Sequence, residues 1–459
     1  MKRNMVRIKP AILSLISLSI VLLFPFIANS QPNLQNLNPT FRQGSGVSEG
    51  GYPCLMDDET AFRKEALQSL RYAHQTSPDT GQVDYRDYDI TIRLYPNRHY
   101  LEGDVQVIFR SKVAQLGRVD FQLYNDTLRI KSVTHRADTL SYTYVDSLEM
   151  LRVWLRDSLG VGQEDTLRIV YNGYITPELS RRMGYGCQLD STMSYSLSPF
   201  VWYPCPYDLF NTYRTFDLGA TGRVRMTVPR TWRAVSNGGL LDSTATDSTQ
   251  TFTWGSANAI SIFVFASGPF LMSIQPYSGI LVRYYAFDTT DARSFLTYTT
   301  SVLNFYSRVF YPYSFEKLAF ADLVGPISRY TIIFQSLSSN LRFWAMIHEV
   351  AHQWWPFLVK TRSLEEAWLY EGFATYSEVM FREDSLGMAS RKGRLDTLAL
   401  QYLDGVPPDS DRPIIPTPFN SMYGGNILYA KGGWVLHMLR GVVGDSTFFN
   451  VMKIGRAHV

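Results

Sequence analysis

The stretch His348-Glu349-Val350-Ala351-His352 carries the strongest signal in this chain of 459 residues. The surrounding segment 341–357 is apolar enough to form a buried helix, so we expect the motif to lie on one. Two histidines four residues apart lie on one helix face, one turn apart, and both imidazoles can bind a single metal ion. Glu349 then lies beside the ion, placed to take a proton from an activated water. An unrelated pair of core histidines is the alternative for these five residues alone.

A zinc ion in a hydrolytic site needs a third protein ligand and an open fourth position. Eighteen residues separate the second histidine from Glu371, which lies inside the segment 364–381, for which we predict a second helix that returns to the metal. Glu365 and Glu366 are competing candidates for the third ligand. We rank them below Glu371, because we expect them at the solvated start of this helix. Glu378 lies two turns beyond Glu371. It is either a hydrogen-bond partner of a histidine ligand or a solvated or core carboxylate without a role in the site.

The N-terminal segment 1–30 has the pattern of a secretory signal peptide. Four basic residues precede an uncharged apolar run at 11–28, and Ala28-Asn29-Ser30 follows as a small-x-small cleavage pattern. We predict cleavage before Gln31, a secreted or periplasmic protein, and no stable membrane association afterwards. An uncleaved membrane anchor is the alternative, although the apolar run is short for a membrane span.

The net charge argues against a nucleic-acid partner. The chain has 44 Lys and Arg and 41 Asp and Glu, a formal charge of +3. Removing the four basic residues of the leader, which has no acidic residue, brings the charge to −1. Neither nucleic acid nor an anionic membrane surface is favoured by such a balance.

The three cysteines, Cys54, Cys187 and Cys205, are too few for a disulfide framework. Cys187 and Cys205 flank one loop-rich stretch, and they either pair or remain as free thiols. No cysteine cluster predicts a second kind of metal site.

The length predicts two or more domains, and 45% apolar with 19% charged residues is a globular composition. We predict a linker with a short helical lead-in over 31–84. Alternation of apolar and polar residues predicts an antiparallel β-saddle or sandwich over 85–275. Residues 276–459 predict an α+β domain, so the fold class is multidomain α+β. Residues 454–459 match the translation of a common sequencing adapter, so we expect that the natural chain continues and that the last domain is truncated.

Together these motifs resemble the aminopeptidase-N family of gluzincin zinc metallopeptidases. The resemblance rests on His-Glu-x-x-His, on Trp368-Leu369-Tyr370-Glu371-Gly372-Phe373-Ala374, on Gln353-Trp354-Trp355 and on Tyr429-Ala430-Lys431-Gly432. Weaker matches such as Trp202-Tyr203-Pro204-Cys205 extend it into the β-rich region. It implies a thermolysin-like catalytic domain, peptide substrates, and one Zn²⁺ on His348, His352 and Glu371. It also implies that Tyr429 stabilises the oxyanion, with Tyr423 as the fallback.

One segment departs from the family. Most members carry Gly-x-Met-Glu-Asn or Gly-x-Met-Glu-Tyr before the zinc helix, and its Glu binds the substrate's α-amine. This chain has Gly325-Pro326-Ile327-Ser328-Arg329-Tyr330 there, and if Tyr330 takes the last position, Arg329 replaces the Glu. Because a cation repels an ammonium group, we predict that Arg329 accepts a carboxylate or a blocked N-terminus, unless the amine is bound elsewhere. A misalignment with Arg329 on the surface is the alternative.

We also predict Tyr330 as a substrate contact, and 330–334 as an edge strand that pairs with the substrate backbone. An ordinary sheet strand is the alternative there. A secreted zinc aminopeptidase is the main functional prediction. A zinc endopeptidase or a hydrolase of non-peptide substrates on the same site is the second. A non-catalytic binding module and a β-domain receptor with an accidental motif are the remote alternatives.

Overall fold

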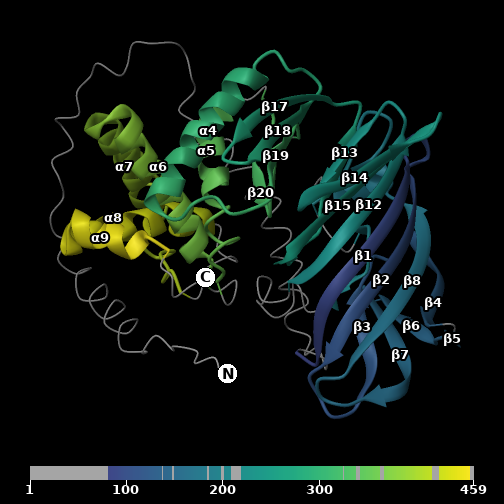
Figure 1. Cartoon of the computed structure of the whole chain (residues 1–459). Coiled ribbons are helices and arrows are strands. Elements are labelled where there is room, and N and C mark those ends of the chain that lie inside the picture. Colours follow the sequence, from purple (N-terminus) through teal and green to yellow (C-terminus); the bar gives the residue numbers. More distant parts are fainter. Residues whose placement is uncertain are drawn as a thin grey trace. The chain divides into compact units, whose positions relative to one another are not determined.

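The computed structural model in Figure 1 describes residues 81–454, except 137, 147–148, 183–185, 198–200, 208–218, 324, 338–341, 362–365 and 416–422. The predictions for the leader, for most of the linker with its helical lead-in, for Cys54 and for the last five residues lie outside this part of the chain. The described residues belong to one compact unit, so the domain boundaries predicted within it stay predictions.

An eight-stranded sheet forms the first large element, in the order β14-β15-β12-β1-β2-β8-β4-β5. Its strands are β1 (Val83–Tyr95), β2 (Tyr100–Ser111), β4 (Leu128–His135), β5 (Asp138–Thr139), β8 (Glu164–Tyr174), β12 (Ala220–Pro229), β14 (Gly239–Ala245) and β15 (Thr249–Ile260). Burial alternates along β1, as the sequence predicts, with Ile90 and Ile92 fully buried between exposed or half-buried neighbours. All neighbours are antiparallel except β1 and β12, which pair in parallel.

Two four-stranded sheets share a core with the large sheet. One has the order β13 (Arg233–Ser236), β16 (Phe265–Gly268), β10 (Ser194–Ser196) and β9 (Cys187–Leu189). The other has the order β11 (Cys205–Pro206), β3 (Leu116–Gln122), β7 (Met150–Leu159) and β6 (Tyr142–Val145). The short helices η3 (Pro96–Arg98) and α3 (Pro177–Arg182) complete this β-rich part. Cys187 and Cys205 are buried free thiols in different sheets, so they do not pair, and burial raises the pKa of Cys187 to about 12.

The second part of the chain combines a five-stranded sheet with helices, shown in green to yellow in Figure 1. The sheet has the order β17 (Leu271–Tyr277), β18 (Ile280–Ala286), β19 (Leu318–Ala321), β21 (Ile332–Phe334) and β20 (Ile327–Arg329). The helices are α4 (Ala292–Val309), α5 (Arg342–Ala351), α6 (Trp368–Leu386), α7 (Met388–Leu403), the π-helical turn η8 (Asn426–Lys431), α8 (Gly432–Val443) and α9 (Asp445–Met452). The predicted fold class, a β-rich region followed by an α+β region, is confirmed.

The predicted edge strand at 330–334 is wrong. β21 lies inside the sheet, parallel to β19 and antiparallel to β20, and β20 is the edge. Ile332, Ile333 and Phe334 are all fully buried. Such a continuous apolar run is typical of a strand covered on both faces rather than of an exposed edge.

The two predicted site helices exist, but the first ends earlier than predicted and the second extends further toward the C-terminus. α5 ends at Ala351, and α6 begins at Trp368 and continues to Leu386. Gly387 ends α6 with φ of +82°, a left-handed conformation that glycine adopts without steric cost, and the chain turns there into α7. Among the described residues, no helix is both long and apolar enough to span a membrane.

Candidate active site

The helix α5 presents both histidines of the motif at its C-terminal end. Met346, Ile347 and Val350 are fully buried and fix one face of the helix in the core. His348 lies on the last turn, and His352 is the first residue after the helix. Their ring centroids are 4.7 Å apart, so the two imidazoles face one small volume.

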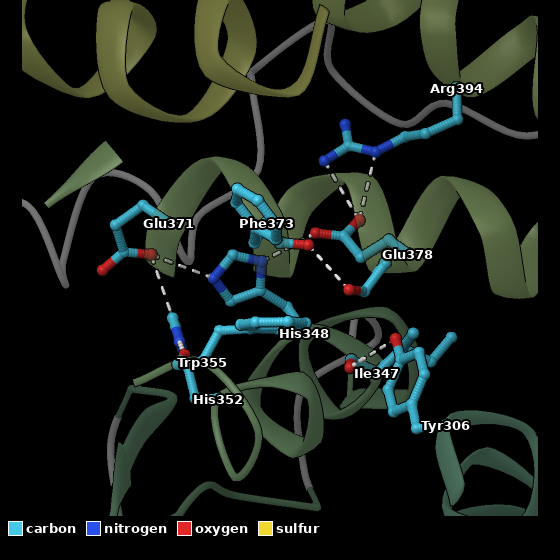
Figure 2. Close-up of polar contacts among 10 residues, drawn as sticks. Tyr306, Ile347, His348, His352, Trp355, Glu371, Phe373, Glu378 and Arg394 are labelled. Carbon is cyan, nitrogen blue, oxygen red and sulfur yellow. Dashed lines mark hydrogen bonds and ion pairs between the residues drawn. The ribbon is translucent and has the colours of Figure 1, made fainter. Parts of the chain in front are cut away.

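Glu371, on the first turn of α6, meets both imidazoles (Figure 2). Its Oε2 lies 3.3 Å from Nε2 of His348 and 3.3 Å from Nε2 of His352. Two ligands about 2.05 Å from one tetrahedral zinc ion are separated by about 3.3 Å. Both distances from the carboxylate therefore have the spacing that a shared zinc ion requires.

Glu349 provides a second carboxylate at the same place. Its ligand atom and those of the two histidines lie within 4.8 Å of one another. Burial raises the pKa of Glu349, and the positive charge of the imidazoles and of Arg329 only partly opposes this effect. A raised pKa suits a proton acceptor, because it brings the carboxylate closer to the pH at which it works.

The opposite nitrogens of the imidazoles are held by protein oxygens. His348 Nδ1 donates to Oε1 of Glu378 at 2.9 Å, and His352 Nδ1 donates to the carbonyl of Trp355 at 2.7 Å. With the proton on Nδ1, a neutral imidazole directs the lone pair of Nε2 toward Glu371. Arg394 Nε donates to the other oxygen of Glu378 at 3.1 Å. Of the two roles considered for Glu378, the structure therefore shows the histidine partner.

The charges around the histidines suit a divalent cation. Burial by itself would raise the pKa of Glu371, but the imidazoles outweigh it and lower this pKa to about 2. Burial by itself would lower the pKa of His348, but its hydrogen bonds to Glu371 and Glu378 raise it well above the ordinary value. Both shifts show that this buried cluster favours positive charge between the histidines and Glu371, which is what a bound cation would supply.

Tyr429 reaches the same region from η8. Its ring centroid lies 5.7 Å from that of His348. The approach depends on two glycines, because a Cβ on Gly372 would lie 3.0 Å from the backbone carbon of Gly432. These glycines follow Glu371 and Lys431 directly, and their contact brings α6 close to the turn that carries Tyr429. A π-helical turn inside helical structure is often found at a functional site.

The structure describes the fallback tyrosine and one of the two competing carboxylates. Tyr423 precedes η8, and its carbonyl accepts a hydrogen bond from the Ile427 amide. Glu366 lies just before α6 and is half-buried, and Glu365 lies outside the described residues.

Arg329 ends the edge strand β20, and its charge acts on Glu349. Tyr330 follows it and is 4% exposed. The Tyr330 hydroxyl donates to Oε2 of Glu316 at 2.8 Å and accepts from Nδ2 of Asn258 at 2.9 Å. These contacts give Tyr330 a structural role, and its assignment as a substrate contact gains no support from them.

Sequence reasoning missed Gln353 as a residue of the site. Its buried amide binds the strand β20 and the turn that follows it, next to His352 in the chain. The sequence motif Gln353-Trp354-Trp355 supplied a family resemblance but no role for the amide, because its partners lie more than twenty residues upstream.

Comparisons with known proteins agree with this geometry. Residues 335–454 match the family described as Peptidase family M1 domain. Aminopeptidase N of Lactococcus lactis subsp. lactis is 34% identical over 113 residues, which are 23% of this chain and 13% of that enzyme. Human endoplasmic reticulum aminopeptidase 2 is 26% identical over 198 residues, which are 37% of this chain and 20% of that protein. The chain therefore spans a small part of the length of these relatives.

Solved structures extend the likeness to the β-rich part. The M1 zinc metallopeptidase of Deinococcus radiodurans superposes with a TM-score of 0.67 at 24% identity, over 81% of this chain and 86% of that one. A mutant of that enzyme bound to a Tyr-Ser-Ala substrate gives a TM-score of 0.66 at 23% identity, with the same coverage. At these identities the likeness establishes the fold. The M1 domain match over 335–454 and the aminopeptidase N relatives, on a fold shared with an M1 zinc metallopeptidase, support an aminopeptidase-N-like gluzincin metallopeptidase.

Proposed function

We propose that this protein is a zinc metallopeptidase that hydrolyses peptide bonds, with an aminopeptidase as the leading form. The observation that carries the proposal is the position of the Glu371 carboxylate, 3.3 Å from both Nε2 atoms of His348 and His352. Three ligands and a separate buried carboxylate are the donor set of a catalytic zinc site, whereas structural zinc sites have four protein ligands.

Each group has a role in this proposal. His348, His352 and Glu371 hold one zinc ion, which when bound polarises a carbonyl and makes water nucleophilic at neutral pH. Glu349 accepts the proton of the attacking water and passes it to the leaving nitrogen. Tyr429 donates a hydrogen bond to the carbonyl oxygen as negative charge develops on it. Glu378 and the Trp355 carbonyl fix the tautomers of the two histidines.

The names of the relatives support a peptide substrate. Several are aminopeptidases, and the Deinococcus structural neighbour was solved with a Tyr-Ser-Ala substrate. Because the chain covers only a small part of the curated relatives, the activity of this chain is our proposal.

Arg329 favours a second candidate, a peptidase that acts on substrates without a free N-terminal amine. Its charge acts on Glu349 and opposes the rise in the pKa of that carboxylate. A guanidinium there would repel a substrate ammonium group and attract a carboxylate. This form includes an endopeptidase and a hydrolase of non-peptide acids on the same zinc site.

One experiment tests the function and separates the candidates. Hydrolysis of a chromogenic dipeptide is measured with its N-terminus free and then acetylated, with and without a zinc chelator. Cleavage of the free form alone supports an aminopeptidase, and cleavage of the acetylated form supports the second candidate. Glu349→Gln should retain zinc and lose about 10²–10⁴-fold in turnover. Zinc binding with no hydrolysis of either form by the folded wild type would instead support a binding module, and absence of zinc would support an accidental motif.

We further propose that the protein is secreted or periplasmic and acts without stable membrane association or nucleic acid. The basic and then apolar segment at 1–30 supports export, and the net charge near zero supports the lack of a polyanionic partner. Fractionation of cells that express the full chain, with N-terminal sequencing of the exported product, tests this proposal. A product that begins at Gln31 is expected.

A further inference from the structure

A threonine with a strained backbone lies in the turn that follows the edge strand β20 of the five-stranded sheet. Thr331 has a φ of +60° and is fully buried. A β-branched residue rarely adopts this left-handed conformation, because its side chain crowds the backbone. The β20–β21 hairpin pairs Arg329 with Ile332, so Tyr330 and Thr331 are the two turn residues, and positive φ at the second of these normally selects glycine.

Four hydrogen bonds hold Thr331 in this conformation. Its Oγ1 accepts from Lys317 Nζ at 3.0 Å and from the Gly238 amide at 2.8 Å. Its own amide donates to Gln353 Oε1 at 3.1 Å, and its carbonyl accepts from the Ala319 amide at 3.0 Å. Glycine, the residue that would fit the conformation without strain, could not provide the hydroxyl that two of these bonds use. The two hydrogen bonds at this strained position therefore depend on the Thr331 side chain.

Lys317 anchors this hydroxyl to the β-rich part of the chain. The side chain is fully buried, and Nζ also donates to the Ser236 carbonyl at 2.7 Å. Nζ lies 5.1 Å from the ring centroid of Trp254. The Lys317 amino group thus connects β13 and β15 to the hairpin turn.

Gln353 connects the same turn to the histidines. It follows His352 directly and is 1% exposed. While its Oε1 accepts from Thr331, its Nε2 donates to Ser328 Oγ at 2.9 Å and to the Arg329 carbonyl at 3.1 Å. One side-chain amide therefore fixes the edge strand β20 and the hairpin turn against the end of α5.

We propose that Lys317, Thr331 and Gln353 form a positioning unit that sets the edge strand β20, with Arg329, at a fixed distance from the zinc ligands and thereby determines substrate binding. None of the three residues is assigned to touch the reacting atoms. An edge strand has unpaired backbone groups and is the part of a sheet that can bind an extended peptide. Small displacements of such a strand weaken binding of an extended peptide without changing the metal ligands. The kinetic part of this inference rests on the proposed peptidase function.

The test compares variants of the full-length zinc-loaded protein. Thr331→Val keeps the branched shape and removes the hydroxyl, and we expect KM to rise about tenfold with kcat within about threefold of wild type. Thr331→Ser keeps the hydroxyl and should restore KM to near wild type. Thr299→Val is the matched control, because Thr299 is equally buried but its hydroxyl donates to the Phe295 carbonyl within α4. It should leave KM and kcat unchanged.

A second readout does not need activity. Amide hydrogen exchange of 327–334 should become faster in Thr331→Val, while the amides of α5 stay as protected as in wild type. Thr331→Gly relieves the strain but lacks the hydroxyl, so it should show the same faster exchange if the valine variant fails to fold. Lys317→Met combined with Thr331→Val should raise KM by less than the product of the two single fold-changes, because both substitutions remove the hydrogen bond between Lys317 and Thr331.

The outcomes separate the two proposals. A wild-type protein that hydrolyses no peptide overturns the proposed function, while faster exchange of 327–334 in the variants still supports the positioning unit. Unchanged exchange together with unchanged KM in the valine and glycine variants overturns the positioning unit. A fall in kcat with unchanged KM, or loss of zinc, overturns it as well, because the unit is assigned to substrate binding alone.

Discussion

The carboxylate of Glu378 lies 2.9 Å from Nδ1 of His348, on the side of the imidazole opposite the Nε2 that faces Glu371. Arg394 binds the second oxygen of the same carboxylate. Both Glu378 and Arg394 are 5% exposed, so this is a buried pair of charged side chains next to a histidine that we propose as a zinc ligand. Its position explains how a histidine on the last turn of α5 is held in one tautomer and one orientation.

Replacing Glu378 by Gln should therefore weaken zinc binding. The amide still accepts the Nδ1 hydrogen bond but loses the charge that makes the imidazole basic, and we expect the zinc affinity to fall by about 10–100-fold. Competition with a chromophoric chelator measures the affinity. Asp384→Asn is the control, since Asp384 lies on the same helix in an exposed ion pair with Arg308. Equal zinc affinity of the Glu378→Gln variant and wild type would contradict the role assigned to Glu378.

Replacing Tyr429 by Phe should remove an oxyanion donor and leave the ring packing against His348. Loss of one such donor typically lowers kcat by about 10²–10³-fold, with KM and zinc content little changed. Steady-state kinetics on the dipeptide that the wild type cleaves measures the effect. Tyr423→Phe is the matched control, and it should retain kcat within about twofold. The opposite ranking of the two variants would transfer the assignment to Tyr423.

The metal cluster was predictable from sequence because its key spacings are local or are carried by one helix. His348 and His352 lie four residues apart, and the long spacing to Glu371 requires only a second helix that returns. The assignment of Tyr429 depends on the family resemblance alone, since a chain with 29 tyrosines offers no physical reason to select one of them. The structure now adds the close contact of Gly372 and Gly432 as the reason that Tyr429 reaches the site.

Other features were beyond the sequence for physical reasons. Alternation of apolar residues assigns the faces of a strand but not its partner, so the parallel pairing of β1 with β12 was not predicted. The run at 332–334 was assigned to an edge although its apolar residues require cover on both faces. The positive φ of Thr331 was also unpredictable, because the bonds that maintain it come from Lys317, Gly238 and Gln353, which are 14 to 93 residues away.

Reversing the charge of Arg329 should change the preference for the substrate N-terminus. In Arg329→Glu a carboxylate replaces the guanidinium near Glu349, so an ammonium group is attracted rather than repelled. We expect the ratio of kcat/KM for the free dipeptide to that for the acetylated dipeptide to rise by about tenfold. Arg329→Met should give an intermediate ratio, which separates charge reversal from loss of the side chain. Arg293→Glu, at an exposed position on α4, controls for net charge. An unchanged ratio in both Arg329 variants would show that Arg329 does not face the substrate N-terminus.

Lys317 should make the stability of the fold depend on pH. Burial lowers the pKa of Lys317 well below its ordinary value, and this outweighs the opposing effect of Glu316, while Arg283 lowers it further. In the unfolded chain the same amine titrates near about 10.4. Between the folded and the unfolded pKa the unfolded state binds the additional proton, so the free energy of unfolding contributed by Lys317 rises with pH across this window, by up to about 1.4 kcal/mol per pH unit.

Lys317→Met removes this dependence together with the hydrogen bonds of the amine. The lost hydrogen bonds shift the free energy of unfolding by an amount that does not vary with pH, so the slope isolates the titration. Urea unfolding of wild type and variant is measured at several pH values from 7 to 10. The free energy of unfolding of the variant should fall further below that of wild type as the pH rises. Lys392→Met, at an exposed ion pair with Asp396, should differ from wild type by nearly the same amount throughout. A constant difference between Lys317→Met and wild type would mean that Lys317 remains protonated in the fold, and that its bonds to Ser236 and Thr331 compensate for its burial.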